Sequence, residues 1–121
     1  MIYVASKAKH GQMWLDLKEK YQLPIKASWL NVYKEGMIED YAAHWMTCIS
    51  EVSSSRAVML YHKQGEVQKG ALVEVGAAIL AGVPVFVFGD VIHDELGSWL
   101  NHPSVCRCSS VEVAVSMVRR V

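Results

Sequence analysis

The sequence predicts an α/β domain over residues 1–121, a three-layer sandwich with a five-stranded parallel sheet of the flavodoxin-like or Rossmann-like kind. Three short runs, residues 2–5, 57–61 and 85–88, are continuously apolar, as expected of strands buried on both faces. Segments with a helical spacing of apolar residues separate them. This alternation of strands and helices produces a parallel sheet that is covered by helices on both sides.

The elements of the first half follow from periodicity and from the residues that interrupt it. Residues 10–21 have helical spacing, and Pro24 closes that region. Residues 25–29 are typical of a second, shorter strand. Residues 31–40 are polar and predict a loop, whereas residues 41–52 return to helical spacing and predict a second helix.

The second half repeats this pattern. A polar loop at residues 62–69 leads into a predicted helix over residues 70–80. A short helical turn near residues 95–100 and a last strand at residues 105–108 follow, before a terminal helix. The expected caps of the two helices are Gly82 and either Ser109 or Ser110. The fold class alone suggests the strand order 2-1-3-4-5.

Composition excludes some classes of partner. Twelve basic and twelve acidic residues give a formal net charge of zero, so no long-range field attracts a nucleic acid polymer. The three cysteines lack framework spacing, and we interpret Cys106 and Cys108 as packing residues. We therefore expect no disulfide, no metal site and no cofactor. The first apolar run is too short for a signal peptide and no later run is long enough to span a membrane, which predicts a cytoplasmic location.

Glu74 is the main candidate for chemistry. Ligands of such folds bind beyond the carboxyl ends of the strands, and Gly70 opens a helix shortly after one of those ends. We expect Glu74 in the first helical turn, where the helix dipole favours its ionised form. The alternative, a solvated glutamate at a helix start, is weakened because the residues around it are almost all small and apolar.

A second candidate is the basic segment after the first strand. Ser6, Lys7, Lys9 and His10, together with free amides at a helix start, could hold a phosphate, although a solvated basic loop has the same composition. The glycine patterns of a P-loop and of a dinucleotide-binding fingerprint are absent.

Aromatic side chains form the third group. Trp29, Trp45 and Tyr61, with His62 beside it, are the candidates to stack on a base, and packing in the core is the competing interpretation for each of them.

Three stretches resemble a known family. They are the opening Ile2-Tyr3-Val4-Ala5-Ser6, the strand Val58-Met59-Leu60-Tyr61, and the segment from Gly70 through Glu74 to Gly82-Val83-Pro84-Val85. The family is the nucleoside 2-deoxyribosyltransferases and the related nucleotide N-hydrolases, and the chain is similar in particular to short bacterial and phage-encoded forms. The likeness extends over most of the chain up to Gly89, and its specific part begins at Gly70.

The resemblance implies a reaction. The glutamate that matches Glu74 attacks the anomeric carbon of a deoxyribosyl group, the base leaves, and a second base or water takes the sugar from the enzyme. Tyr3 matches a tyrosine that lines the sugar pocket and positions the nucleophile. The expected partners are a deoxynucleoside or a deoxynucleoside 5′-monophosphate and further copies of the chain in a homo-oligomer. Lys7, Lys9 and His10 favour the nucleotide.

The chain departs from the family at two places. An Asp often follows the third strand in the family, and here that region has none, so His62 and Glu66 are the candidates to replace it. In many members the residues just before the motif glycine are acidic or small, whereas here they are Gln68 and Lys69. Two other function classes stay open. One is a nucleotide-binding module without catalysis. The other is a flavin-binding or receiver domain, although a receiver needs an acidic side chain where Tyr61 stands.

Overall fold

A four-stranded parallel sheet forms the centre of the computed structural model, which describes residues 1–91 and 94–121. Its strands are β1 (Ile2–Ala5), β2 (Ala57–His62), β3 (Val85–Gly89) and β4 (Val105–Arg107). They are hydrogen-bonded in the order β1-β2-β3-β4. All of β1 is buried, as are most residues of β2 and β3, because helices cover both faces of the sheet.

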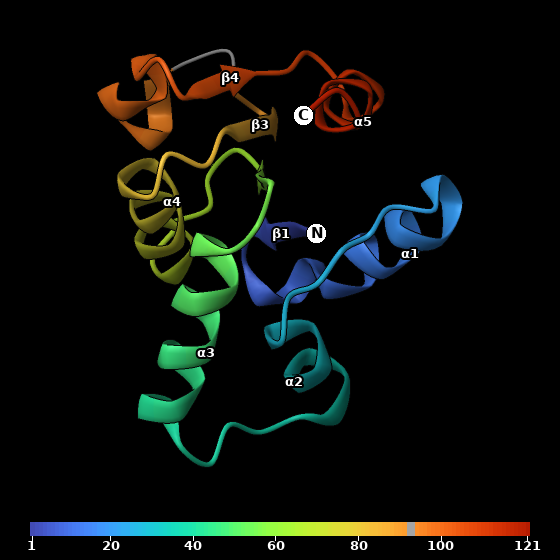
Figure 1. Ribbon diagram of the computed structural model, residues 1–121, viewed down its shortest axis with the longest axis vertical. Coiled ribbons are helices and arrows are strands. Elements are labelled where there is room, and N and C mark those ends of the chain that lie inside the picture. The colour runs from blue at the N-terminus through green and yellow to red at the C-terminus, as the bar shows by residue number, and fades with distance from the viewer. Residues whose placement is uncertain (92–93) are drawn as a thin grey trace.

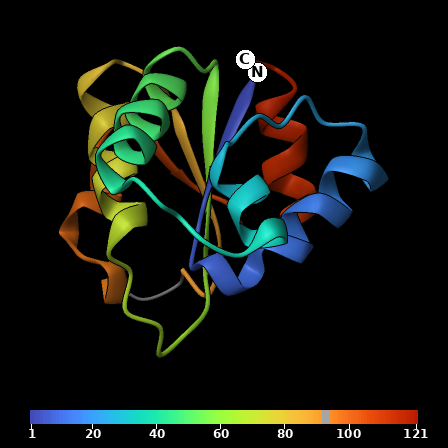
Figure 2. The same cartoon turned by 90° about the horizontal axis from the view of Figure 1, so that it is seen from below.

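Helices form the two outer layers (Figures 1 and 2). On one face lie α1 (Gly11–Tyr21) and α5 (Val111–Val118), and on the other lie α3 (Tyr41–Ser53) and α4 (Gly70–Leu80). The short α2 (Trp29–Glu35) contacts α1 and the 3-10 turn η1 (Ala8–His10). Two further 3-10 turns, η2 (Asp94–Leu96) and η3 (Ser98–Asn101), precede β4. None of the helices in the described part of the chain combines the length and the apolar character that crossing a membrane requires.

The predicted caps are confirmed. Gly82 has a φ of +74° after the end of α4, and its N–H bonds to the carbonyl of Ile79 while that of Val83 bonds to Ala78. This is a Schellman arrangement, in which the positive φ favours glycine. At the start of α5 the Ser110 side chain accepts a hydrogen bond from the Val113 N–H, so Ser110 rather than Ser109 is the cap.

The prediction of five strands is wrong, because residues 25–29 do not form a strand. Only Ile25 pairs, in an isolated parallel bridge with Ile2. The bonds Ile2 N–H to Pro24 O and Lys26 N–H to Ile2 O place this bridge on the edge of β1 that faces away from β2. The predicted second strand therefore has the expected neighbour but ends after one residue, since the chain turns into α2 at Trp29.

The predicted loop at residues 31–40 is also wrong in its first half, which belongs to α2. Glu51 of α3 anchors the start of this helix: its carboxylate accepts from the Ser28 N–H at 2.9 Å and from the Ser28 hydroxyl at 2.8 Å. Gly36, at φ +113°, follows the last helical residue. A tertiary contact thus sets the beginning of α2, and periodicity over seven residues does not reveal it.

Candidate active site

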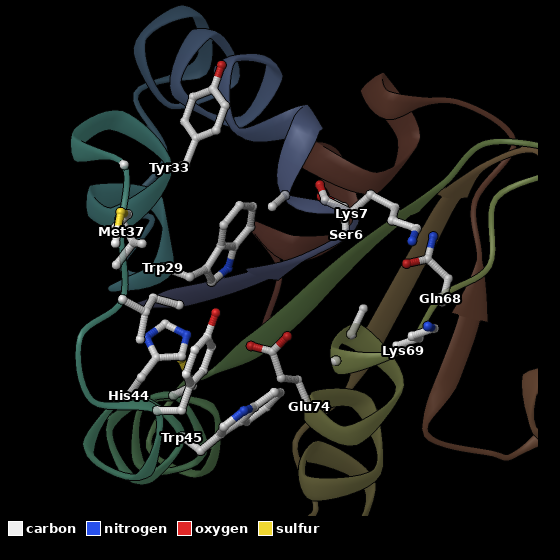
Figure 3. A pocket seen from close by; sticks show the side chains of 18 residues that line it. Ser6, Lys7, Trp29, Tyr33, Met37, His44, Trp45, Gln68, Lys69 and Glu74 are labelled. Atoms are coloured by element: carbon white, nitrogen blue, oxygen red, sulfur yellow. The ribbon is translucent and has the colours of Figure 1, made fainter.

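A cavity of about 650 Å³ lies beyond the carboxyl end of β1. Its walls come from the segment after β1 (Ser6, Lys7), from α2 (Trp29), from α3 (Trp45) and from α4 (Glu74), as Figure 3 shows. The walls are mainly apolar with a few polar groups, as in most sites for small organic molecules. The cavity is therefore at the sheet edge where ligands of parallel α/β folds bind.

Glu74 lines this cavity, whereas Tyr3, which was expected to line the pocket, is not among the lining residues and lies behind Glu74. The hydroxyl of Tyr3 on β1 donates a hydrogen bond to Oε2 of Glu74 on α4. Tyr3 is completely buried, and Glu74, at 7% exposure, reaches the cavity. The packing of α4 against the sheet brings together two residues that are 71 positions apart in the sequence.

Glu74 was expected to be ionised at a helix start, and the structure gives it a different protonation state. Because α4 begins at Gly70, Glu74 is the fifth helical residue, and the first turn contains no acidic side chain. Burial dominates instead and raises the pKa of Glu74 to about 8. At neutral pH the carboxyl is mainly protonated, and the ionised form is a minor species.

The two tryptophans of the cavity are held in different ways. Trp29 is the first residue of α2 rather than the end of a strand, and its indole N–H donates to the Val4 carbonyl at 2.8 Å. Trp45 lies against Gly70, where an added Cβ would stand 3.1 Å from the ring. Both rings border the cavity and supply flat apolar surfaces for a planar ligand.

The cavity contains two lysines. Lys7 and Lys69 both line it, and within the residues that the structure describes neither ammonium group forms a salt bridge. Ser6 is also a lining residue, but its hydroxyl is already engaged: it accepts from the Trp14 indole N–H at 2.9 Å and donates to the Lys7 carbonyl at 2.8 Å. The positive charge available to a ligand therefore comes from the lysines.

The structure does not bring the other predicted binding residues to this cavity. His10 and Lys9 both contact the carboxylate of Glu66, at 2.8 and 3.2 Å. Tyr61 stands edge-on to His10 and borders a second cavity of about 310 Å³. His62 is fully buried, and neither it nor Glu66 lines this cavity.

Several cavity residues were missed from the sequence. Gln68 and Lys69 stand directly before Gly70, so their position beside the motif was a usable signal. Apart from Ala8 and Ala71, the remaining ones belong to α2, α3 and the segment between them, and only the tertiary structure places them at the cavity. Those with polar side chains or sulfur are Tyr33, Met37, Tyr41, His44 and Cys48.

Cys48 and His44 do not form an activated nucleophile. Their Sγ and Nε2 atoms are 3.5 Å apart on α3. Burial, and to a smaller extent the charge of Glu51, raises the pKa of the Cys48 thiol to about 11, so it stays protonated at neutral pH. Of the two acids in the cavity, Glu74 ionises at a lower pH than Cys48 does, because their pKa values are raised to about 8 and about 11.

No cluster of three or more His, Cys, Asp or Glu side chains in residues 1–91 and 94–121 is arranged to hold a metal ion.

Comparisons with known proteins found no family model, no curated protein and no solved structure that matches the chain.

Proposed function

We propose that this protein cleaves or transfers the N-glycosidic bond of a deoxynucleoside or a deoxynucleoside 5′-monophosphate through a covalent glycosyl–Glu74 intermediate. The observation that carries the proposal is Glu74, which lines a cavity bordered by Trp29 and Trp45 and is hydrogen-bonded to the buried Tyr3. A carboxylate at the cavity floor can attack the anomeric carbon of a sugar whose base lies against the indole rings.

The proposed reaction has two steps. An oxygen of ionised Glu74 forms a bond to the anomeric carbon, the N-glycosidic bond breaks, and the base leaves with the bonding electrons and takes up a proton from the solvent. Water or a second base then attacks the same carbon, the bond to Glu74 breaks, and Glu74 leaves as a carboxylate while the proton of the acceptor passes to the solvent. The Tyr3 hydroxyl fixes the orientation of the carboxylate in both steps and stabilises its charge when it leaves.

Charge in the cavity favours the nucleotide over the nucleoside. Lys7 and Lys69 lie at the cavity without a salt-bridge partner among the described residues, and a 5′-phosphate would supply one. Lys9 and His10, also expected to bind phosphate, are paired with Glu66 instead. The preference for a nucleotide therefore depends on Lys7 and Lys69.

The test is to incubate the purified protein with each deoxynucleoside and each deoxynucleoside 5′-monophosphate, with and without an acceptor base, and to follow free base by chromatography. Wild-type protein should release base, and Glu74→Gln should lower the rate by at least about 1000-fold because the nucleophile is lost. Glu66→Gln, which changes an acid outside the cavity, is the matched control and should stay within about 3-fold. Full turnover by Glu74→Gln would exclude the covalent intermediate.

A non-catalytic nucleotide-binding module is the second candidate. The observation in its favour is the raised pKa of Glu74, because a protonated carboxyl is not a nucleophile. A module of this kind would bind deoxynucleotides equally well in wild-type and Glu74→Gln forms, and neither form would release base at any pH.

We further propose, from the family resemblance, that the protein is a cytoplasmic homo-oligomer. Apolar side chains on the solvent side of α3 and α4 support this: Met46, Val73 and Leu80 are 75%, 55% and 91% exposed. Exposed apolar residues on two helices that cover the same face of a sheet are typical of an interface with another chain.

A further inference from the structure

One buried polar atom of the cavity wall has no partner. Gln68 is 7% exposed, and its Oε1 is the one buried side-chain oxygen or nitrogen among the described residues that forms no hydrogen bond. Gln68 lines the cavity, and in Figure 3 its amide oxygen points toward the side where Trp29 and Glu74 lie. Leaving an acceptor buried without a donor is unfavourable, so such an atom requires an explanation.

His62 and Glu95, which do not line the cavity, determine the orientation of the Gln68 amide. Glu95 Oε2 lies 3.3 Å from His62 Nε2, and the Glu95 Oε1 atom accepts from the Gly65 N–H at 3.0 Å. These two donors lower the pKa of Glu95, which is therefore ionised at neutral pH and can only accept. An imidazole with a single hydrogen that donates to this carboxylate carries it on Nε2, and the Nδ1 of His62 then presents a lone pair to Gln68.

The lone pair of His62 decides which end of Gln68 faces the cavity. Gln68 Nε2 is 3.1 Å from His62 Nδ1, so the amide nitrogen donates to the imidazole. The amide oxygen is left on the cavity side as an acceptor. Reversing the amide would oppose two acceptors, Gln68 Oε1 and His62 Nδ1, and the chain Glu95–His62–Gln68 therefore fixes an acceptor in the cavity wall.

We infer that Gln68 Oε1 accepts a hydrogen bond from the exocyclic amino group of the substrate's base, so that the cavity selects amino-bearing bases over their oxo counterparts. Cytosine and adenine each present an N–H donor where uracil and hypoxanthine present a carbonyl oxygen. An oxo group would place a second acceptor against Gln68 Oε1 and leave both unpaired. The inference rests on the proposed function for the class of ligand, and it adds which bases are accepted.

The three residues of the hydrogen-bonded series Glu95–His62–Gln68 have different roles. Gln68 contacts the base and determines specificity. His62 and Glu95 are positioning residues, because neither lines the cavity and both act through the Gln68 amide. Removing the Glu95 carboxylate frees the imidazole to move its hydrogen to Nδ1, and the Gln68 amide can then reverse and present its NH₂ group instead.

The experiment compares substrates that differ only at the amino position. Binding of dCMP, dUMP, dAMP and dIMP to the Glu74→Gln protein is measured by calorimetry, so that turnover does not interfere. We expect dCMP to bind at least about 10-fold more tightly than dUMP, and dAMP than dIMP. Gln68→Leu, made in the same protein, should bring both ratios to within about 3-fold. Glu95→Ala should also lower both affinity ratios.

Gln64→Leu is the matched control, because Gln64 is an exposed glutamine in the same loop and does not line the cavity. Circular dichroism checks that each variant is folded, and Glu95→Ala, at a partly exposed side chain, keeps the test available if Gln68→Leu does not fold. Equal affinities for amino and oxo ligands, ratios that survive Gln68→Leu, or binding of none of the four would each overturn the inference.

Base release by the wild-type protein separates this inference from the proposed function. Release without any amino preference would sink the inference and leave the glycosidic reaction in place. A preference in binding without release would leave the inference in place and favour the binding module.

Discussion

At the scale of single residues, two effects compete for the charge of Glu74. A helix start favours a carboxylate, whereas an apolar environment favours the neutral acid. Burial prevails because Glu74 is one helical turn beyond the start of α4 and is 7% exposed. The Tyr3 hydroxyl is its one hydrogen-bond donor among the described side chains. Glu74 should thus behave as a weak acid whose ionisation is linked both to activity and to folding.

The free energy of unfolding should fall as the pH rises. The pKa of Glu74 is about 8 in the folded protein against 4.5 for the ordinary group, so its contribution is complete below pH 4.5 and is lost as pH rises through 8. At about 1.4 kcal/mol per pKa unit, wild type should lose roughly 3–4 kcal/mol between pH 5 and 8.5 relative to Glu74→Gln. Urea unfolding at a series of pH values measures this. Parallel curves for the two proteins would contradict it.

Turnover should depend on pH in the opposite sense. If ionised Glu74 attacks the sugar, kcat/KM should rise about 10-fold per pH unit below pH 8 and level off above it. Tyr3→Phe removes a hydrogen-bond donor to the carboxylate. The kcat/KM of this variant should therefore start to rise at a higher pH and should reach a lower plateau than that of the wild type. A rate that is flat from pH 6 to 9 would assign the attack to another group.

At the scale of elements, the beginning of α4 shapes the cavity. Gly70 leaves room for the Trp45 ring, since an added Cβ would lie 3.1 Å from it. Farther along the same helix Gly76 is exposed, and no atom lies within 4 Å of where its Cβ would be. One helix therefore contains a glycine beside the cavity and another in open space.

Substituting each of these glycines by alanine should separate the effect of side-chain packing on ligand binding from the effect of helix propensity on the free energy of unfolding. Gly70→Ala should displace the Trp45 ring and weaken deoxynucleotide binding by about 10-fold, while the protein stays folded. Gly76→Ala should leave binding unchanged and raise the free energy of unfolding by about 0.5–1 kcal/mol. Calorimetric titration and urea unfolding provide the two readouts. Unchanged binding by Gly70→Ala would mean that Trp45 does not border the bound ligand.

At the scale of the whole molecule, the solvent side of α3 and α4 is the expected interface between copies of the chain. Leu80→Lys places a charge on the most exposed, at 91%, of the large apolar side chains that the structure describes, and should weaken self-association at least about 10-fold. Val113→Lys on α5, on the other face of the sheet, is the matched control. Sedimentation equilibrium measures both. A wild-type protein that is monomeric at all concentrations would refute the proposed oligomer.

Most of the fold could be predicted from the sequence because its signals are local. Runs such as Val85–Gly89 are apolar on both faces. The Gly82 cap depends on the positive φ of that one residue. The short elements were predicted poorly. Ile25 was assigned to a strand and Trp29–Glu35 in part to a loop, because a single bridge and a seven-residue helix depend on neighbours rather than on periodicity.

The sequence by itself determined the class of fold, the sheet edge at which a ligand would lie, and Glu74 as the side chain to examine. Only the tertiary structure decided which side chains meet there. It pairs Tyr3 with Glu74, places His10 against Tyr61 rather than at the cavity, and gives the Gln68 oxygen no donor among the described residues. The physical reason is that burial and hydrogen bonding depend on distances between segments far apart in the chain, whereas sequence patterns report the preferences of neighbouring residues.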